Sequence, residues 1–277
     1  MSYEFAPNRM YRMPTHFGPA TGPRQGPDGG RFACVENPKT TAISVSFLTK
    51  PEGLTPLLPP GFALAGEPVV TVTASYITEI EWLAGRGYNT LGVSFPALFT
   101  GAVDQVTGNF LTVLWENLTD PIITGREELG FAKIYCELPE PTILHGETHC
   151  TASWLGFKFL DLTVNNLRQV SEAERNTTTA APSDGTLHYK YMPRTGEWGQ
   201  ADVAYAVLTP AATPNRVVKE LWHGTGSVTF HQARWEDLPT QYMIVNTFHA
   251  WEILEYRGAT VTKTIGGKDL SDQRILR

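Results

Sequence analysis

The chain has 277 residues, of which 42% are hydrophobic and 11% aromatic, so it is long enough to bury the core of one large domain. Its formal net charge is −6, and a chain of this acidity lacks the basic field that attracts nucleic acid or anionic lipid. We therefore expect neither a nucleic-acid partner nor a membrane partner.

Cysteine content and the N-terminus indicate the compartment. Cys34, Cys136 and Cys150 are too few for a disulfide framework and show no CxxC spacing, which fits a reducing environment. The N-terminus has no apolar signal segment, and no run of about 18 apolar residues occurs. These features predict a cytoplasmic protein.

Glycine and proline are concentrated between residues 18 and 30, a density that sustains neither a helix nor a central strand. We predict an extended N-terminal arm, residues 1–31, followed by a single domain, residues 32–277. The arm carries apolar side chains that need covering, either by the domain or by a neighbouring subunit, so we expect a homo-oligomer. A disordered arm is the alternative.

Strand-like runs recur along the remaining chain. Residues 69–80, rich in Val, Thr, Tyr and Ile, are the clearest, and others lie at 42–48, 92–100, 110–115, 148–159, 203–208 and 227–230. Residues 161–175 have a pattern compatible with a helix, and residues 171–185 predict a mobile surface excursion. The fold class that follows is α+β and mostly β, with one large antiparallel sheet, closed or half-closed, and a few peripheral helices.

Residues 124–136, TGREELGFAKIYC, carry the clearest functional signal. Thr124 and Glu127 have the spacing of a capping box, which predicts a helix start, and Gly130 is expected to end that turn. The residues that follow are mostly apolar or aromatic, with Lys133 as their single charge, and predict a buried strand.

An amine held among apolar neighbours loses the hydration of its charged form, so its pKa falls and it can form a Schiff base with a carbonyl compound. Lys133 is the candidate for this chemistry. The alternative is that Lys133 buries only its stem and keeps its amine in water.

The segment GREELGFAK, residues 125–133, resembles the GRE…(F/Y)PK segment of the acetoacetate decarboxylase-like superfamily, in which the lysine forms the Schiff base. Lys133 stands eight residues after Gly125, as in that pattern. Fainter similarity extends over roughly residues 35–260. The resemblance implies a cone-like or barrel-like sheet with the lysine inside, a small-molecule carbonyl substrate, and neither a cofactor nor a metal.

Several positions depart from the family's pattern. Its second lysine falls on Ile134, and its two carboxylates fall on Thr73 and Thr90. Its carboxylate-binding arginine falls near Thr40, with Lys39, Arg31 and Arg24 as approximate substitutes. Decarboxylating a 3-oxo acid requires the substrate carboxylate to be held, so these losses put decarboxylation in doubt. These losses would not prevent the lysine from forming an imine.

The site residues that we predict fall into two groups. The catalytic residues are Lys133, with Tyr88, Glu116 and Tyr135 moving protons, and the substrate-binding residues are Thr73, Thr90, Phe131 and Arg31. Strand alternation would place Phe131 and Tyr135 on the face of Lys133, and Ala132 and Ile134 on the other.

We also weighed a metal site. His145, Glu147 and His149 would share one face of a strand, but no second Cys/His pair lies nearby in the sequence, so we expect these histidines to be surface or cross-strand residues.

The function predicted is that of a cofactor-independent Schiff-base lyase, of aldolase, dehydratase or hydratase type, acting on a small 2-oxo acid or related carbonyl compound. One alternative is an acetoacetate-type decarboxylase with a rebuilt carboxylate pocket. The other is a non-enzymatic protein that binds an apolar ligand in its interior, with the lysine inert.

Overall fold

The computed structural model describes residues 10–11, 24–177 and 183–277. Most of the predicted N-terminal arm therefore lies outside the described residues, as do residues 178–182 of the predicted surface excursion. Within the described ranges, no helix is long and apolar enough to span a bilayer.

The elements follow one another in a mostly β chain. The helical segments are α1 (Pro51–Leu54), η2 (Thr55–Leu57), η3 (Glu81–Leu83), α2 (Thr119–Thr124), η4 (Gly125–Leu129), α3 (Glu172–Thr177) and α4 (Tyr242–His249). The strands are β1 (Lys39–Leu48), β2 (Phe62–Leu64), β3 (Val69–Thr78), β4 (Tyr88–Thr100), β5 (Gln105–Glu116), β6 (Lys133–Tyr135), β7 (Thr142–Leu144), β8 (Glu147–Trp154), β9 (Phe157–Gln169), β10 (Gly185–Pro193), β11 (Ala201–Pro210), β12 (Val217–Phe230), β13 (Glu255–Ile265) and β14 (Arg274–Ile275).

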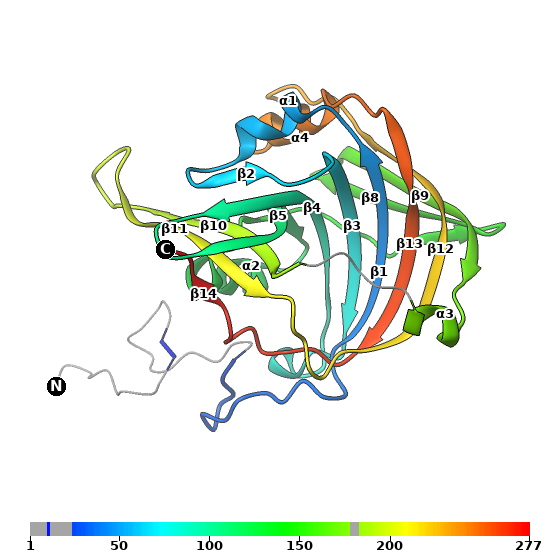
Figure 1. Ribbon diagram of the computed structural model, residues 1–277, viewed down its shortest axis with the longest axis horizontal. Coiled ribbons are helices and arrows are strands. Elements are labelled where there is room, and N and C mark those ends of the chain that lie inside the picture. The colour runs from blue at the N-terminus through cyan, green and yellow to red at the C-terminus, as the bar shows by residue number, and fades with distance from the viewer. Residues whose placement is uncertain (1–9, 12–23, 178–182) are drawn as a thin grey trace.

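In the part of the chain that the structure describes, these strands form one sheet in the order β14-β11-β10-β5-β4-β3-β1-β13-β12-β9-β8-β7, with β2 beside β4 and β6 beside β5. Figure 1 shows β3, β1, β13 and β12 side by side as a curved wall, with α1 and α4 together at one end. The prediction of an α+β, mostly β fold is confirmed.

Of the closed or half-closed antiparallel sheet that was predicted, the closed, barrel-like form and the purely antiparallel pairing are wrong. The sheet is mixed, because β5 pairs in parallel with both β6 and β10. It is also open, since its two ends are β14 and β7. These edge strands have only two and three residues, and such short edges do not supply the ladder that closure needs.

Alternation along the strands separates two faces of the sheet. On β3 the buried side chains are Val70, Val72, Ala74 and Tyr76, and the side chains between them are half-buried. The second face carries small polar groups, such as Ser44 and Thr73, whose hydroxyl oxygens lie 2.8 Å apart across β1 and β3. The apolar face supplies the core, and the second face leads toward the cavity described below.

The helix expected within residues 161–175 is wrong over most of its length, because β9 continues to Gln169. Leu160, Leu162 and Val164 are buried at every second position, and β9 pairs with β8 on one side and with β12 on the other. Backbone pairing on both sides overrides local helix propensity. Helix α3 forms only at Glu172–Thr177.

The segment before Lys133 differs in detail from its prediction. The helix begins at Thr119, so Thr124 lies within it and the capping-box prediction is wrong. Gly130 does end the helix, in left-handed conformation with φ of 80°, as predicted. The strand that follows, β6, is only three residues long.

Candidate active site

Strand β6 places the lysine, and several contacts fix this strand. It runs parallel to β5, with Lys133 opposite Leu114 and Tyr135 opposite Glu116. The buried side chain of Gln241 accepts a hydrogen bond of 2.6 Å from the Trp115 indole and donates one of 3.0 Å to the Tyr135 carbonyl. The lysine therefore projects from a backbone that is bonded on both sides.

The Lys133 amine is buried, with the residue only 6% exposed. Its Nζ lies 2.8 Å from Glu116 Oε1, donates a hydrogen bond of 3.1 Å to the Pro121 carbonyl, and lies 5.6 Å from the centre of the Phe131 ring. The amine is thus held inside the fold beside a carboxylate, a carbonyl and a ring face.

Glu116 is completely buried at the end of β5. Burial raises the pKa of its carboxyl group, and the neighbouring Lys133 ammonium opposes that rise. Neither carboxylate oxygen has a well-aligned hydrogen bond from the described residues, so the close contact with Lys133 is the main compensation for burying the charge. The carboxyl group and the amine therefore lie within direct proton-transfer distance of each other.

Gly125 makes room for the lysine side chain. A Cβ atom at this position would lie 2.4 Å from Cδ and Cε of Lys133 and 2.6 Å from its Nζ. The helix also widens here into the π-helical turn η4, a conformation that is frequent at functional sites. Arg126 closes the turn by donating a hydrogen bond of 2.8 Å to the Lys133 carbonyl.

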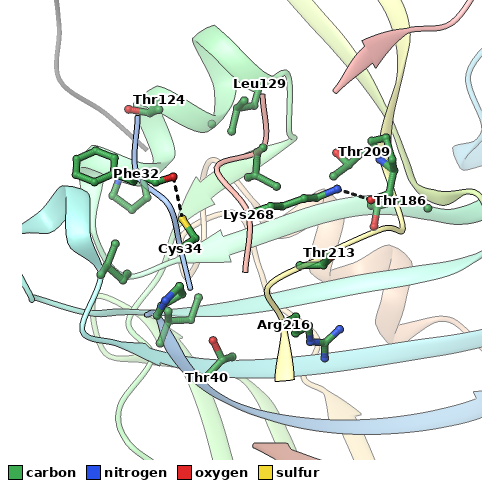
Figure 2. Close-up of a pocket in the computed structure, with 18 of the residues that line it drawn as sticks. Phe32, Cys34, Thr40, Thr124, Leu129, Thr186, Thr209, Thr213, Arg216 and Lys268 are labelled. Carbon is green, nitrogen blue, oxygen red and sulfur yellow. Dashed lines mark hydrogen bonds between the residues drawn. The ribbon is translucent and has the colours of Figure 1, made fainter. Parts of the chain in front are cut away.

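A cavity of about 540 Å³ opens beside the lysine. Helix α2 and η4 line one side with Pro121, Thr124, Gly125 and Leu129, and the sheet contributes Thr40, Ile77 and Tyr88. In Figure 2, Thr124 and Leu129 stand on one side of the cavity, and Thr40 and Arg216 on the opposite side. The volume is typical of a small-molecule site.

Tyr88 lines this cavity and is half-buried. Burial raises the pKa of its phenol, and the nearby Glu116 carboxylate raises it further. The hydroxyl therefore stays protonated at neutral pH and is suited to donate a hydrogen bond to a substrate oxygen. Of the predicted catalytic residues, the structure thus brings Lys133, Glu116 and Tyr88 together.

Tyr135 does not lie together with Lys133, Glu116 and Tyr88. Although it lies two positions after Lys133, it is 42% exposed and does not line the cavity, because the short strand β6 reaches the surface at this end. The predicted alternation of side chains is observed on the other face of the strand, where Ala132 and Ile134 both line a separate apolar cavity.

The predicted binding residues lie at different distances from the amine. Phe131 contacts it through its ring face. Thr90 is buried opposite Glu116 on the neighbouring strand, but does not line the cavity. Thr73 pairs with Gly92 further along the sheet and is hydrogen-bonded to Ser44.

Arg31 is also outside the site. It is exposed, forms an ion pair of 2.6 Å with Asp269, and is not among the cavity-lining residues. Arg216 and Lys268, from loops beyond β11 and β13, line the cavity instead. Both are distant in sequence from the lysine segment, and no local pattern marks them.

His188 is a further residue that the sequence did not mark. It is fully buried and stacks on Phe131, with ring centres 4.2 Å apart. Its Nδ1 lies 3.0 Å from the Gly130 carbonyl, which can only accept, so Nδ1 carries the hydrogen, and Nε2 accepts from the Thr209 hydroxyl at 3.2 Å. Burial lowers the pKa of His188 to about 4, so it supports Phe131 as a neutral ring.

Metal-ligand side chains do not converge in the described ranges, where no group of three or more His, Cys, Asp or Glu residues could hold a metal ion. His149 instead contacts the Asp161 carboxylate, with Nε2 2.7 Å from Oδ1. The groups that the structure brings together at the lysine are its amine, the Glu116 carboxyl group and the Tyr88 phenol.

Known proteins of similar structure place this arrangement in context. An acetoacetate decarboxylase from Legionella pneumophila subsp. pneumophila str. Philadelphia 1 is 18% identical, with a TM-score of 0.63 over 91% of this chain and 92% of its own. The enduracididine biosynthesis enzyme MppR complexed with pyruvate is 16% identical, with a TM-score of 0.60 over 91% and 95% of the two chains. MppR complexed with the condensation product of pyruvate and imidazole 4-carboxaldehyde is 15% identical, with a TM-score of 0.60 over 86% and 87%.

Comparison with curated proteins returned no match. The structural similarities lie at low identity and establish the shared fold. The sequence profile described as "Acetoacetate decarboxylase (ADC)" matches residues 12–264, which is most of the chain. The chain therefore belongs to the acetoacetate decarboxylase family.

Proposed function

We propose that this enzyme forms an imine between Lys133 and a small oxo acid, and uses the imine for lyase chemistry of the aldolase or dehydratase type. The observation that carries the proposal is the buried Lys133 amine, 2.8 Å from the Glu116 carboxylate and on the wall of a cavity. A lysine with only a packing role would keep its amine in water.

Glu116 gives the amine a route to its reactive form. Transfer of the ammonium proton to the carboxylate leaves a neutral amine, which attacks the substrate carbonyl carbon and forms a C–N bond. Protonated Glu116 then returns that proton to the former carbonyl oxygen and relays a second proton to it from the attacking nitrogen, so that the oxygen leaves as water when the C=N bond forms. The proton is conserved, and no external base is needed for this step.

The iminium then acts as the electron sink for bonds next to it. Transfer of a proton from the adjacent carbon to the Glu116 carboxylate gives an enamine, whose carbon can attack an aldehyde. Protonated Glu116 then supplies the proton of the new hydroxyl group, and the reverse sequence cleaves the same bond. Tyr88, as a neutral phenol on the cavity wall, is placed to donate a hydrogen bond to the oxygen that becomes the new hydroxyl group.

The relatives support the choice of substrate class. MppR has been solved with pyruvate, and with the condensation product of pyruvate and an aldehyde. In this chain, threonines stand at the two positions where the sequence resemblance expects carboxylates, and Thr90 lies directly opposite the reactive carboxyl group on β5. This change favours condensation over decarboxylation of a 3-oxo acid.

The test is reductive trapping. Wild-type protein is incubated with pyruvate, other 2-oxo acids or acetoacetate, then reduced with borohydride and mapped by peptide mass spectrometry. We expect the label on Lys133, and none in Lys133→Arg, whose guanidinium forms no imine.

The matched control is Lys39→Arg, which changes an exposed lysine that is ion-paired with Glu79 and is not among the cavity-lining residues. This variant should be labelled as wild type is. Failure of every carbonyl compound to mark Lys133, or equal labelling of exposed lysines, would refute the proposal.

A further inference from the structure

We infer that Arg216 is the anion-binding residue of the Lys133 cavity, and that the second reactant, which the Lys133 enamine attacks, carries a carboxylate or phosphate group. The identity of that reactant rests on the proposed function. The anion-binding role of Arg216 is testable without it.

Arg216 belongs to the same cavity as the lysine but comes from a different part of the fold. It precedes β12 and lines the cavity together with Thr40 and Thr213, opposite Thr124 and Leu129 on the helical side (Figure 2). An anion held at Arg216 would therefore lie in the space that Lys133 also faces.

The backbone around Arg216 is fixed. Its N–H donates a hydrogen bond of 3.1 Å to the Thr213 carbonyl, and the preceding Asn215 side chain donates one of 2.8 Å to the Ala33 carbonyl. Gly266 packs so tightly here that a Cβ would lie 2.1 Å from the Asn215 carbonyl oxygen. Because the loop is fixed, ligand binding has to order the side-chain rotamers of Arg216 but not its backbone.

The guanidinium of Arg216 has no ion pair or side-chain hydrogen bond with the described residues. Other arginines are engaged, such as Arg31 with Asp269, Arg257 with Glu67 and Arg274 with Asp104. Arg216 is an exposed residue, so its guanidinium is reached by solvent and by a ligand alike. Its five N–H donors remain available for bidentate pairing with a carboxylate or phosphate.

The two other cations that line the cavity already have an acidic partner. Lys268 pairs with Asp272 at 2.7 Å, and Lys133 pairs with Glu116. The Glu81 carboxylate also lines the cavity and accepts a hydrogen bond of 3.2 Å from the Cys34 N–H, which leaves its charge in place. Among the cavity-lining residues that the structure describes, Arg216 is therefore the cation that has no ion-pair partner. An anionic ligand would neutralise it.

The size of the cavity favours a second reactant over a single three-carbon acid. A volume of about 540 Å³ lies within the range of sites that enclose drug-sized ligands. A 2-oxo acid bound to Lys133 would leave much of this space open. An aldehyde with an anionic group at its far end would fill the space and contact Arg216 while its carbonyl group faces the enamine.

The test measures binding of two anions that have no reactive carbonyl group, succinate and inorganic phosphate, by isothermal titration calorimetry at low ionic strength. The proteins are wild type, Arg216→Gln, and the control Arg168→Gln. Arg168 is exposed on β9, pairs with Glu174 and lies outside the cavity, so the control makes the same change in net charge. Circular dichroism and thermal melting of each variant establish that it is folded.

We expect at least one anion to bind wild type and Arg168→Gln equally. Arg216→Gln should bind that anion about ten- to a hundredfold more weakly, as for loss of a charge-assisted hydrogen-bond pair. Tighter binding of phosphate would indicate a phosphorylated reactant, and tighter binding of succinate a carboxylated one.

The inference is overturned if neither anion binds wild type, if Arg216→Gln binds as wild type does, or if Arg168→Gln loses as much affinity. Because neither probe can form an imine, these outcomes are independent of whether Lys133 is trapped by an oxo acid. The two proposals can therefore fail separately.

Discussion

Replacing Gly125 with alanine tests whether the position of the Lys133 amine determines reactivity. Gly125 has ordinary helical backbone angles, φ −65° and ψ −35°, so alanine is tolerated by the backbone and has the higher helix propensity. The new Cβ, however, would lie 2.4 Å from Cδ and Cε of Lys133, where ordinary contact begins at 3.4 Å. The side chain must therefore move by about 1 Å.

A displacement of about 1 Å of a reacting group can lower a rate about a hundredfold, because the group no longer lies in line with the carbonyl carbon. We expect Gly125→Ala to fold, with a stability loss of about 1–3 kcal/mol for overpacking. The rate of borohydride trapping by pyruvate should fall about a hundredfold. Because the lysine side chain is flexible, we expect it to move away from the added methyl group and to lose its contact with Glu116, while the fold is retained.

The assay is single-turnover trapping under saturating borohydride, followed by mass spectrometry, with urea unfolding measured on the same samples. The control is Gly267→Ala, where the nearest atom to the added Cβ is 3.8 Å away. Its trapping rate should equal that of wild type. If Gly125→Ala were folded and trapped pyruvate within threefold of the wild-type rate, the position of the amine would not limit the reaction.

Four further outcomes are expected. Lys133→Ala and Lys133→Arg should both abolish trapping while the near-UV circular dichroism is retained, and residual labelling of either variant would exclude Lys133 as the nucleophile. Glu116→Gln keeps the side-chain volume but cannot take up the ammonium proton, so the trapping rate should fall about 10²- to 10⁴-fold; a rate within tenfold of wild type would rule out this proton transfer. His188, with its pKa lowered from 6.5 to about 4, stays neutral where the unfolded chain takes up a proton. The free energy of unfolding should therefore be greatest above pH 6.5 and decrease by about 3 kcal/mol toward pH 4; His188→Gln should lose this dependence in urea titrations at pH 7 and pH 5, and an unchanged difference would contradict it. Finally, carbon dioxide release from acetoacetate should be negligible, and rapid release would overturn the choice of condensation over decarboxylation.

The sequence by itself determined the fold class and the candidate nucleophile. The strand-like runs at residues 42–48 and 69–80 correspond to β1 and β3, since period-two alternation with β-branched residues is a local property of the chain. The GRE segment indicated Lys133, and the structure buries its amine beside a cavity. The sequence also showed the glycine of that segment, but not why position 125 is a glycine. The reason is the close approach of the Lys133 side chain, and such a steric contact cannot be inferred from residue spacing.

Tertiary structure alone decided which residues surround the amine. Tyr135 and Arg31 were reasonable from sequence proximity, yet a three-residue strand carries Tyr135 to the surface and Asp269 holds Arg31 away. Arg216 and His188 reach the site through pairings between strands far apart in the chain, and such pairings depend on the register of the whole sheet. The open edges of the sheet were likewise set by two short strands at opposite ends, β7 and β14, because closure depends on the pairing of both edges and not on any single segment.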